Sequence, residues 1–228
     1  MSWWVVFQLY NWIAIRTETP DYFRLTDQAF FAQSMSYQQM SLTHPDTLLL
    51  DAALFQATNE ARRQAGLPVL LYDFSLYRSA SLHAESMIDK QFYGHENFYS
   101  LADRTAFNRI QKQTRRFNWT AENIGQYQTI DTPEWFGVRR NKRTGQYEYL
   151  NSQTKELYQP YTYAAFARYA VQQWLHSPHH RANLLNPMFT HVGCAARLSL
   201  NPFLEQHAPY SRLVQNFAGN ATPIQASK

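Results

Sequence analysis

The chain has 228 residues, enough for one domain with a sizeable core, and its 45% hydrophobic and 16% aromatic content is typical of a folded globular protein. Its formal net charge is +4, but the Lys and Arg residues are scattered and form only short clusters, such as those at 115–116 and 139–143. A nucleic-acid-binding surface usually needs a continuous basic stripe, so we expect no nucleic-acid partner.

The sequence has a single cysteine, Cys194, which excludes a disulfide within the chain. The domain must therefore be held together by packing. Cys194 follows a glycine in an apolar run, a setting that predicts a buried, inert thiol and no nucleophile.

The N-terminal part begins with an apolar run at residues 3–15, which Gln8 and Asn11 interrupt. The run is shorter than the ~20 residues that a membrane-spanning helix needs, so we expect no transmembrane helix. No basic residue precedes it and no small-residue cleavage site follows, which makes a signal peptide a poor fit. Two interpretations stay open: part of an export signal, or an element packed on the domain. Residues 1–47 as a whole are interpreted as an N-terminal extension.

The chain after residue 47 predicts an alternation of helices and strands. The first helix is expected at 48–65, capped by Asp46 or Thr47 and ended by Gly66, with an apolar stripe facing the core. That stripe consists of Leu50, Leu54, Ala57, Ala61 and Ala65. The later elements are a strand at 69–71, helices at 75–90, 100–113 and 162–176, and closing strands at 191–200 and 212–217.

Between these elements, Asn123 to Gly125 are interpreted as the end of a turn, and residues 126–161 as an inserted Tyr-rich region. Within the insertion we expect a hairpin that turns at 142–145. A role in lining a cleft or binding a partner and a solvated surface role are both open for this hairpin.

A histidine-rich turn, WLHSPHHR, follows the last predicted helix at residues 174–181. Pro178 cannot continue a helix, so one helix should end near Ser177 and a short one should begin at Pro178, with Ser177 as the N-cap and its hydroxyl engaged by backbone N–H groups. His179 and His180 then lie in a first turn, where the positive helix end favours neutral imidazole.

Four fragments in order resemble the CAP superfamily, which includes cysteine-rich secretory, antigen 5 and pathogenesis-related 1 proteins, in its bacterial form. They are LLLDAALFQATNEARRQAGLPVLLYD at 48–73, HAESMIDKQFYGHEN at 83–97, AENIG at 121–125 and WLHSPHHRANLLNPMFTHVGC at 174–194. The resemblance implies an α+β fold, a three-layer α-β-α sandwich carrying the inserted hairpin. The CAP domain is expected at 48–219, followed by a tail at 220–228.

The resemblance also implies a central cleft formed by His95, Glu122 and His180. Two neutral imidazoles oriented by a carboxylate are competent to bind a divalent metal, so zinc is the candidate cofactor, with His95 and His180 as ligands and His179 as the substitute if His180 points away. An acidic residue that many eukaryotic members carry before the second histidine has no counterpart here, because no Asp or Glu stands between Glu156 and Glu205. Structural roles are expected for the remaining motif residues, Trp174, Ser177, Arg181 and Asn183.

Three functions are therefore open. The favoured one is a secreted, non-enzymatic module, extracellular or periplasmic, whose cleft binds a small or lipidic ligand or an extracellular partner protein. The second is a metal-assisted hydrolase using His95, His180 and Glu122. The third is a structural envelope protein. Fold resemblance does not choose among them, because function depends on the site.

Overall fold

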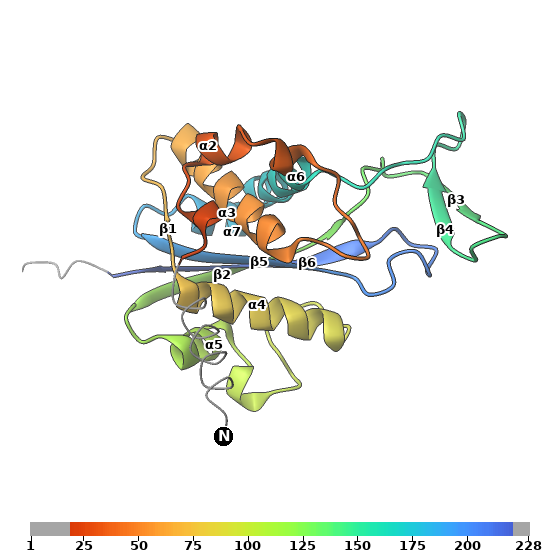
Figure 1. Ribbon diagram of the computed structural model, residues 1–228. Coiled ribbons are helices and arrows are strands. Elements are labelled where there is room, and N and C mark those ends of the chain that lie inside the picture. The colour runs from red at the N-terminus through yellow and green to blue at the C-terminus, as the bar shows by residue number, and fades with distance from the viewer. Residues whose placement is uncertain (1–18, 221–228) are drawn as a thin grey trace, which may run out of the picture.

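The computed structural model describes residues 19–220 and has the predicted α+β, three-layer α-β-α architecture. A four-stranded sheet has the order β1-β5-β6-β2. In Figure 1, helices α2, α3, α6 and α7 lie over one face of this sheet, and α4 and α5 lie over the other. The sheet consists of β1 (Leu71–Tyr72), β5 (His191–Leu198), β6 (Tyr210–Gly219) and β2 (Trp119–Gln128).

The first layer contains the helices predicted at 48–65 and 162–176, confirmed to within two residues, the short helix expected to begin at Pro178, and α2, which was not predicted. It contains α2 (Asp27–Phe31), α3 (Thr47–Gln64), α6 (Tyr163–His176) and α7 (Pro178–Leu184). Asp46 caps α3 by accepting a hydrogen bond from the backbone N–H of Leu49 at 3.0 Å. The chain leaves α3 through Gly66, whose φ of +72° suits a residue without a side chain. Ala65 was expected in the core stripe, but it lies past the helix end and is exposed.

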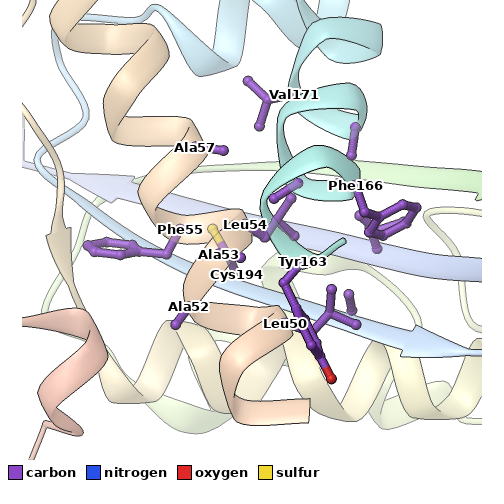
Figure 2. Packing of buried hydrophobic residues seen from close by; sticks show 14 of the residues in the cluster. Leu50, Ala52, Ala53, Leu54, Phe55, Ala57, Tyr163, Phe166, Val171 and Cys194 are labelled. Atoms are coloured by element: carbon purple, nitrogen blue, oxygen red, sulfur yellow. The ribbon is translucent and has the colours of Figure 1, made fainter. Parts of the chain in front are cut away.

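Packing of α3 against α6 forms the main core above the sheet (Figure 2). Leu50, Leu54 and Phe166 are at most 1% exposed, and Cys194 contributes to the same cluster from β5. Burial raises the pKa of the Cys194 thiol to about 12, so the expected inert thiol is confirmed.

The residues before α3 are part of this core. Short turns η1 (Asp21–Phe23) and η2 (Ser34–Tyr37) flank α2, and their segment buries Phe23, Phe30 and Met40 in the main cluster. The described part of the expected extension thus packs on the domain, whereas the apolar run at 3–15 and tail residues 221–228 lie outside the described residues.

The second layer consists of α4 (Phe74–Asp89) and α5 (Ala106–Gln113). Gly193 of β5 allows α4 to approach the sheet closely, because a Cβ there would lie only 1.9 Å from the backbone nitrogen of Tyr77. The single helix expected at 100–113 is instead η3 (Leu101–Asp103) followed by α5, since Thr105 caps a new helix.

The insertion contains the predicted hairpin, formed by β3 (Gly137–Arg140) and β4 (Tyr147–Leu150), which projects away from the sandwich (Figure 1). Among residues 19–220, no helix is both long and apolar enough to cross a bilayer.

Candidate functional site

Strand β2 carries the centre of the candidate site at one edge of the sheet. Asn123 to Gly125, expected to end a turn, lie instead in the middle of this strand, paired with Gln215 to Leu213 of β6. The preference of Asn123 and Gly125 for turns is overridden because neighbouring helices bury the strand. Successive residues of a strand face opposite sides, so Glu122 faces the α5 layer and Asn123 the α7 layer.

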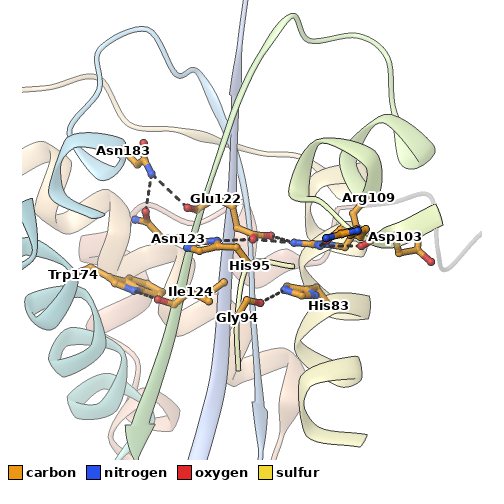
Figure 3. Close-up of polar contacts among 11 residues, drawn as sticks. His83, Gly94, His95, Asp103, Arg109, Glu122, Asn123, Ile124, Trp174 and Asn183 are labelled. Atoms are coloured by element: carbon orange, nitrogen blue, oxygen red, sulfur yellow. Dashed lines mark hydrogen bonds and ion pairs between the residues drawn. The ribbon is translucent and has the colours of Figure 1, made fainter. Parts of the chain in front are cut away.

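The carboxylate of Glu122 is almost completely buried, with 2% of its side chain exposed, and all its contacts are to hydrogen-bond donors (Figure 3). Arg109 Nη2 donates to Oε1 at 2.9 Å and to Oε2 at 2.7 Å. Asn216, directly opposite on β6, donates to Oε2 at 3.1 Å in the amide orientation that also satisfies its other neighbours. Burial alone would raise the pKa of Glu122, but the His95 hydrogen bond and the Arg109 charge outweigh it, and the pKa lies below its usual value.

His95 is oriented by this carboxylate, as expected. Its Nδ1 lies 2.9 Å from Glu122 Oε1, and a deprotonated carboxylate only accepts, so Nδ1 carries the proton, and in the neutral ring Nε2 is an acceptor. The His95 side chain is 53% exposed. The ring is thus held from one side and open to solvent on the other.

The loop that carries His95 is anchored by a second histidine. His83 on α4 is 1% exposed, and its Nε2 donates to the carbonyl oxygen of Gly94 at 3.0 Å (Figure 3). Burial lowers the pKa of His83 to about 4, so the ring is neutral at physiological pH.

His180 reaches the site from α7. Asn123 Nδ2 donates to the His180 carbonyl oxygen at 3.1 Å, and Asn183 Nδ2 donates to Asn123 Oδ1 at 2.9 Å. Burial lowers the pKa of His180, and the neighbouring His95 and His179 lower it further, so His95 and His180 lie in one electrostatic neighbourhood. His179 is exposed. The structure therefore brings His95 and Glu122 into direct contact and places His180 where it interacts electrostatically with His95.

The expected structural residues have different outcomes. Trp174 is fully buried, and its Nε1 donates to the Ile124 carbonyl oxygen at 2.9 Å, which fixes α6 to the edge of β2 (Figure 3). Ser177 is the N-cap of α7, but its side chain makes no capping hydrogen bond, because the residue also ends α6 and caps through its backbone. The expected structural role of Arg181 is wrong: its side chain is exposed and makes no hydrogen bond within the described chain.

Sequence reasoning missed Arg109. The residue lies beside Ile110 on the inner face of α5, and its Nη1 also donates to the carbonyl oxygens of Asp103 and Arg104 at 3.0 and 3.1 Å. Arginine on a short polar helix is usually solvated, so the single sequence carried no signal for its burial.

The site offers fewer ligands than a catalytic zinc ion usually has. Catalytic zinc sites usually have three protein ligands, whereas Glu122 is committed to Arg109 and leaves two histidines. Across residues 19–220, no group of three or more His, Cys, Asp or Glu side chains is placed to hold a metal ion. Metal ligation by His95 and His180 stays a prediction.

A separate cavity of about 650 Å³ lies where α3 begins and α4 ends, and its walls include Leu42, Glu85, Arg197 and Phe203 but none of the three cleft residues. The histidine site therefore lies outside this cavity.

Comparison with known proteins identifies several that are similar to this chain. It is 26% identical over 138 residues to the uncharacterized protein YkwD of Bacillus subtilis strain 168, over 60% of this chain and 38% of that protein. Two solved structures are similar: an extracellular protein containing an SCP domain from Bacillus anthracis (22% identity, TM-score 0.47, 76% of this chain and 41% of that one) and an outer surface protein from Borrelia burgdorferi (18% identity, TM-score 0.46, 74% and 90%).

The chain spans less than half the length of YkwD and of the Bacillus anthracis protein. Residues 55–201, more than half of the chain, match the Cysteine-rich secretory protein family, CAP. This match contains His95, Glu122 and His180 together with α4, α5, β2 and α7. The chain therefore belongs to the CAP family.

Proposed function

We propose that the chain is an extracellular or periplasmic, non-enzymatic module that binds a small or lipidic ligand, or a partner protein, at the site around His95 and His180. The observation that carries this proposal is the pairing of Glu122 with Arg109, through one guanidinium nitrogen at 2.9 and 2.7 Å from the two carboxylate oxygens. This pairing determines which groups are free to react.

A general base needs an accessible carboxylate or imidazole whose pKa is close to the working pH. Glu122 fails on both counts, because it is buried and its pKa lies below the usual value. What the site offers is an oriented acceptor, His95 Nε2, and a neutral His180. These groups suit a ligand that presents an N–H or O–H donor.

A metal-assisted hydrolase is the second candidate, favoured by the shared neighbourhood of the two histidines. With the pKa of His180 lowered, its ring is neutral and competent as a metal ligand at neutral pH. The residues present supply two donors, His95 and His180, and a metal bound there would act as a Lewis acid. The structural-envelope alternative predicts neither a ligand nor a metal.

Zinc titration by calorimetry at pH 7.5 separates the first two candidates. The protein is titrated as wild type, His95→Ala, His180→Ala, His179→Ala and the control His44→Ala, an exposed histidine in the loop before α3. The binding module predicts the same weak binding for all five proteins. Tight zinc binding that is lost on substitution of His95 and His180, and that weakens at acid pH because metal ligation needs neutral imidazoles, would favour the hydrolase.

Native mass spectrometry tests the binding module directly and separates it from the structural-envelope alternative. Wild type, the His95→Ala/His180→Ala double variant and His44→Ala are produced in the native host. The proposal expects one small molecule that co-purifies with wild type and His44→Ala and is absent from the double variant. Identical spectra for the three proteins would contradict it.

A further inference from the structure

Arg212 on β6 is a buried guanidinium without a carboxylate partner. Only 6% of the residue is exposed, and its Nε donates to the Phe92 carbonyl oxygen at 3.2 Å. Its Nη1 is buried and has no acceptor within the described chain. None of the ion pairs among residues 19–220 includes Arg212. A buried charge normally has a partner, because removing it from water is costly.

The other buried or partly buried arginines with known partners among residues 19–220 follow that rule. Arg109 is paired with Glu122, and Arg197 with Asp51. Arg62 donates to the carbonyl oxygens of four residues, Pro68, Leu184, Asn186 and Phe189. Arg212 makes one such bond, which distinguishes it from the rest of the set.

Two aromatic rings and a second arginine, which is already paired with Asp51 and Glu85, surround Arg212. Arg197 is directly opposite it in the β5–β6 register. The rings of Tyr93 and Tyr210 lie 5.2 and 4.6 Å from the Arg212 guanidinium carbon, an arrangement that attracts a cation weakly but does not neutralise it. Burial lowers the pKa of Arg212, yet a guanidinium stays charged at any physiological pH.

Arg212 lines a cavity of about 510 Å³ beside β2 and β6. Its other lining residues are Gln126, Tyr127, Gln128, His207, Ala208 and Tyr210. Gln126 is directly opposite Arg212 in the β2–β6 register, so the two side chains share a face. The Gln128 Oε1 accepts from Thr132, which leaves its amide N–H groups as donors. The carboxylate of Glu205 is engaged by His207. The cavity thus combines one unpaired cation with neutral donors.

We propose that Arg212 anchors an oxyanion-binding site, in which a carboxylate or phosphate group of a small ligand receives the guanidinium N–H groups, with Gln126 as a second donor. A planar guanidinium fork matches two oxygens of either group. The site is separate from the histidine site: Gln126 is four residues beyond Glu122 on the same face of β2, about 13 Å along the strand. It is independent of the function proposed above, and its anchor Arg212 lies beyond the residues 55–201 that match the family, whereas Gln126 lies within them.

Thermal melting with sodium acetate and with sodium phosphate, at an ionic strength held constant with NaCl, tests the site. Acetamide is the neutral counterpart of acetate. The variants are Arg212→Gln and the control Arg168→Gln, since Arg168 also lies over an aromatic ring, Phe31, but has its carboxylate in Glu60. We expect a saturable rise in Tm for wild type and Arg168→Gln with at least one oxyanion, none with acetamide, and at least tenfold weaker binding in Arg212→Gln.

Two further variants keep the test decisive if Arg212→Gln does not fold. Arg212→Lys retains the charge but loses the fork, and Gln126→Leu alters an exposed side chain. Both should bind the oxyanion several-fold more weakly than wild type. Acetate and phosphate compared on one protein identify which oxyanion the site takes. An equal Tm rise in wild type, Arg212→Lys and Gln126→Leu, or no rise in wild type beyond that of NaCl, would overturn the proposal.

Discussion

Arg109 and Glu122 form a buried ion pair that joins α5 to the edge strand of the sheet, with 4% and 2% of their side chains exposed. Arg109 also holds the carbonyl oxygens of Asp103 and Arg104, so the cation fixes the loop that precedes its own helix. The pair therefore connects the candidate site to the packing of the second layer.

Arg109→Met should lower the free energy of unfolding by roughly 3–5 kcal/mol, because it leaves Glu122 charged and buried without its cation. Arg104→Met is the control, since the Arg104–Glu96 pair is about half exposed and exposed pairs contribute only about 0–1 kcal/mol. Urea unfolding measures both. Adding Glu122→Gln to Arg109→Met should cost less than the sum of the single changes, because the uncompensated charge is gone. Strict additivity would show that the two side chains are not coupled.

Trp174→Ala should destabilise the protein by roughly 3–5 kcal/mol, since it removes a fully buried ring and leaves the Ile124 carbonyl oxygen without its donor. Trp135→Ala is the matched control, because that ring is 85% exposed on the insertion and its loss should change stability little. Both are measured as denaturant midpoints at constant slope. Equal midpoints for the two variants would refute the anchoring role of Trp174.

The sequence predicted the helices better than the site, for local reasons. Asp46 and the Ser177-Pro178 pair are helix boundaries that depend only on nearby backbone, so both positions are confirmed. The centre of β2 was missed because Asn123 and Gly125 favour turns in isolation, whereas Asn123 is buried by partners distant in sequence.

The same distinction applies to the candidate site. Family motifs predicted the contact between His95 and Glu122, but Arg109 lies outside the four matched fragments, and the motif that begins at His83 gave no indication of its role. Their roles depend on burial, which a single sequence does not encode at a lone polar position.

Asp51 should make the protein more stable as the pH falls from about 6 towards 4. The carboxylate is fully buried, and its Oδ1 accepts the Ala196 backbone N–H at 2.7 Å, at the edge of β5 that the short β1 leaves open. Burial raises its pKa from 3.8 to about 6, although Arg197 opposes the shift. The native state therefore binds the proton first in this window, and stability decreases as the pH rises through it, by on the order of 3 kcal/mol.

Asp51→Asn removes this titration and keeps an acceptor for Ala196. Urea unfolding at pH 4.5, 5.5 and 6.5 should show that wild type loses more stability than the variant as the pH rises. Parallel curves for the two proteins would show that the Asp51 carboxylate titrates alike in both states.

His83 should act in the opposite direction over nearly the same window. Burial lowers its pKa from 6.5 to about 4, so between these values the unfolded chain binds a proton that the native state does not, and stability is lost as the pH falls. His83→Gln retains a donor for the Gly94 carbonyl oxygen and removes the titration. Acidification from pH 6.5 to 4.5 should therefore destabilise wild type more than His83→Gln, by on the order of 2–3 kcal/mol. The exposed His179→Gln is the control and should follow wild type.

The Asp51 and His83 effects oppose each other, so the pH profile of wild-type stability alone reveals neither. Opposite changes of slope in the two variants would establish both groups. A His83→Gln profile that superimposes on wild type would mean that His83 is protonated as readily in the native state as in the unfolded chain.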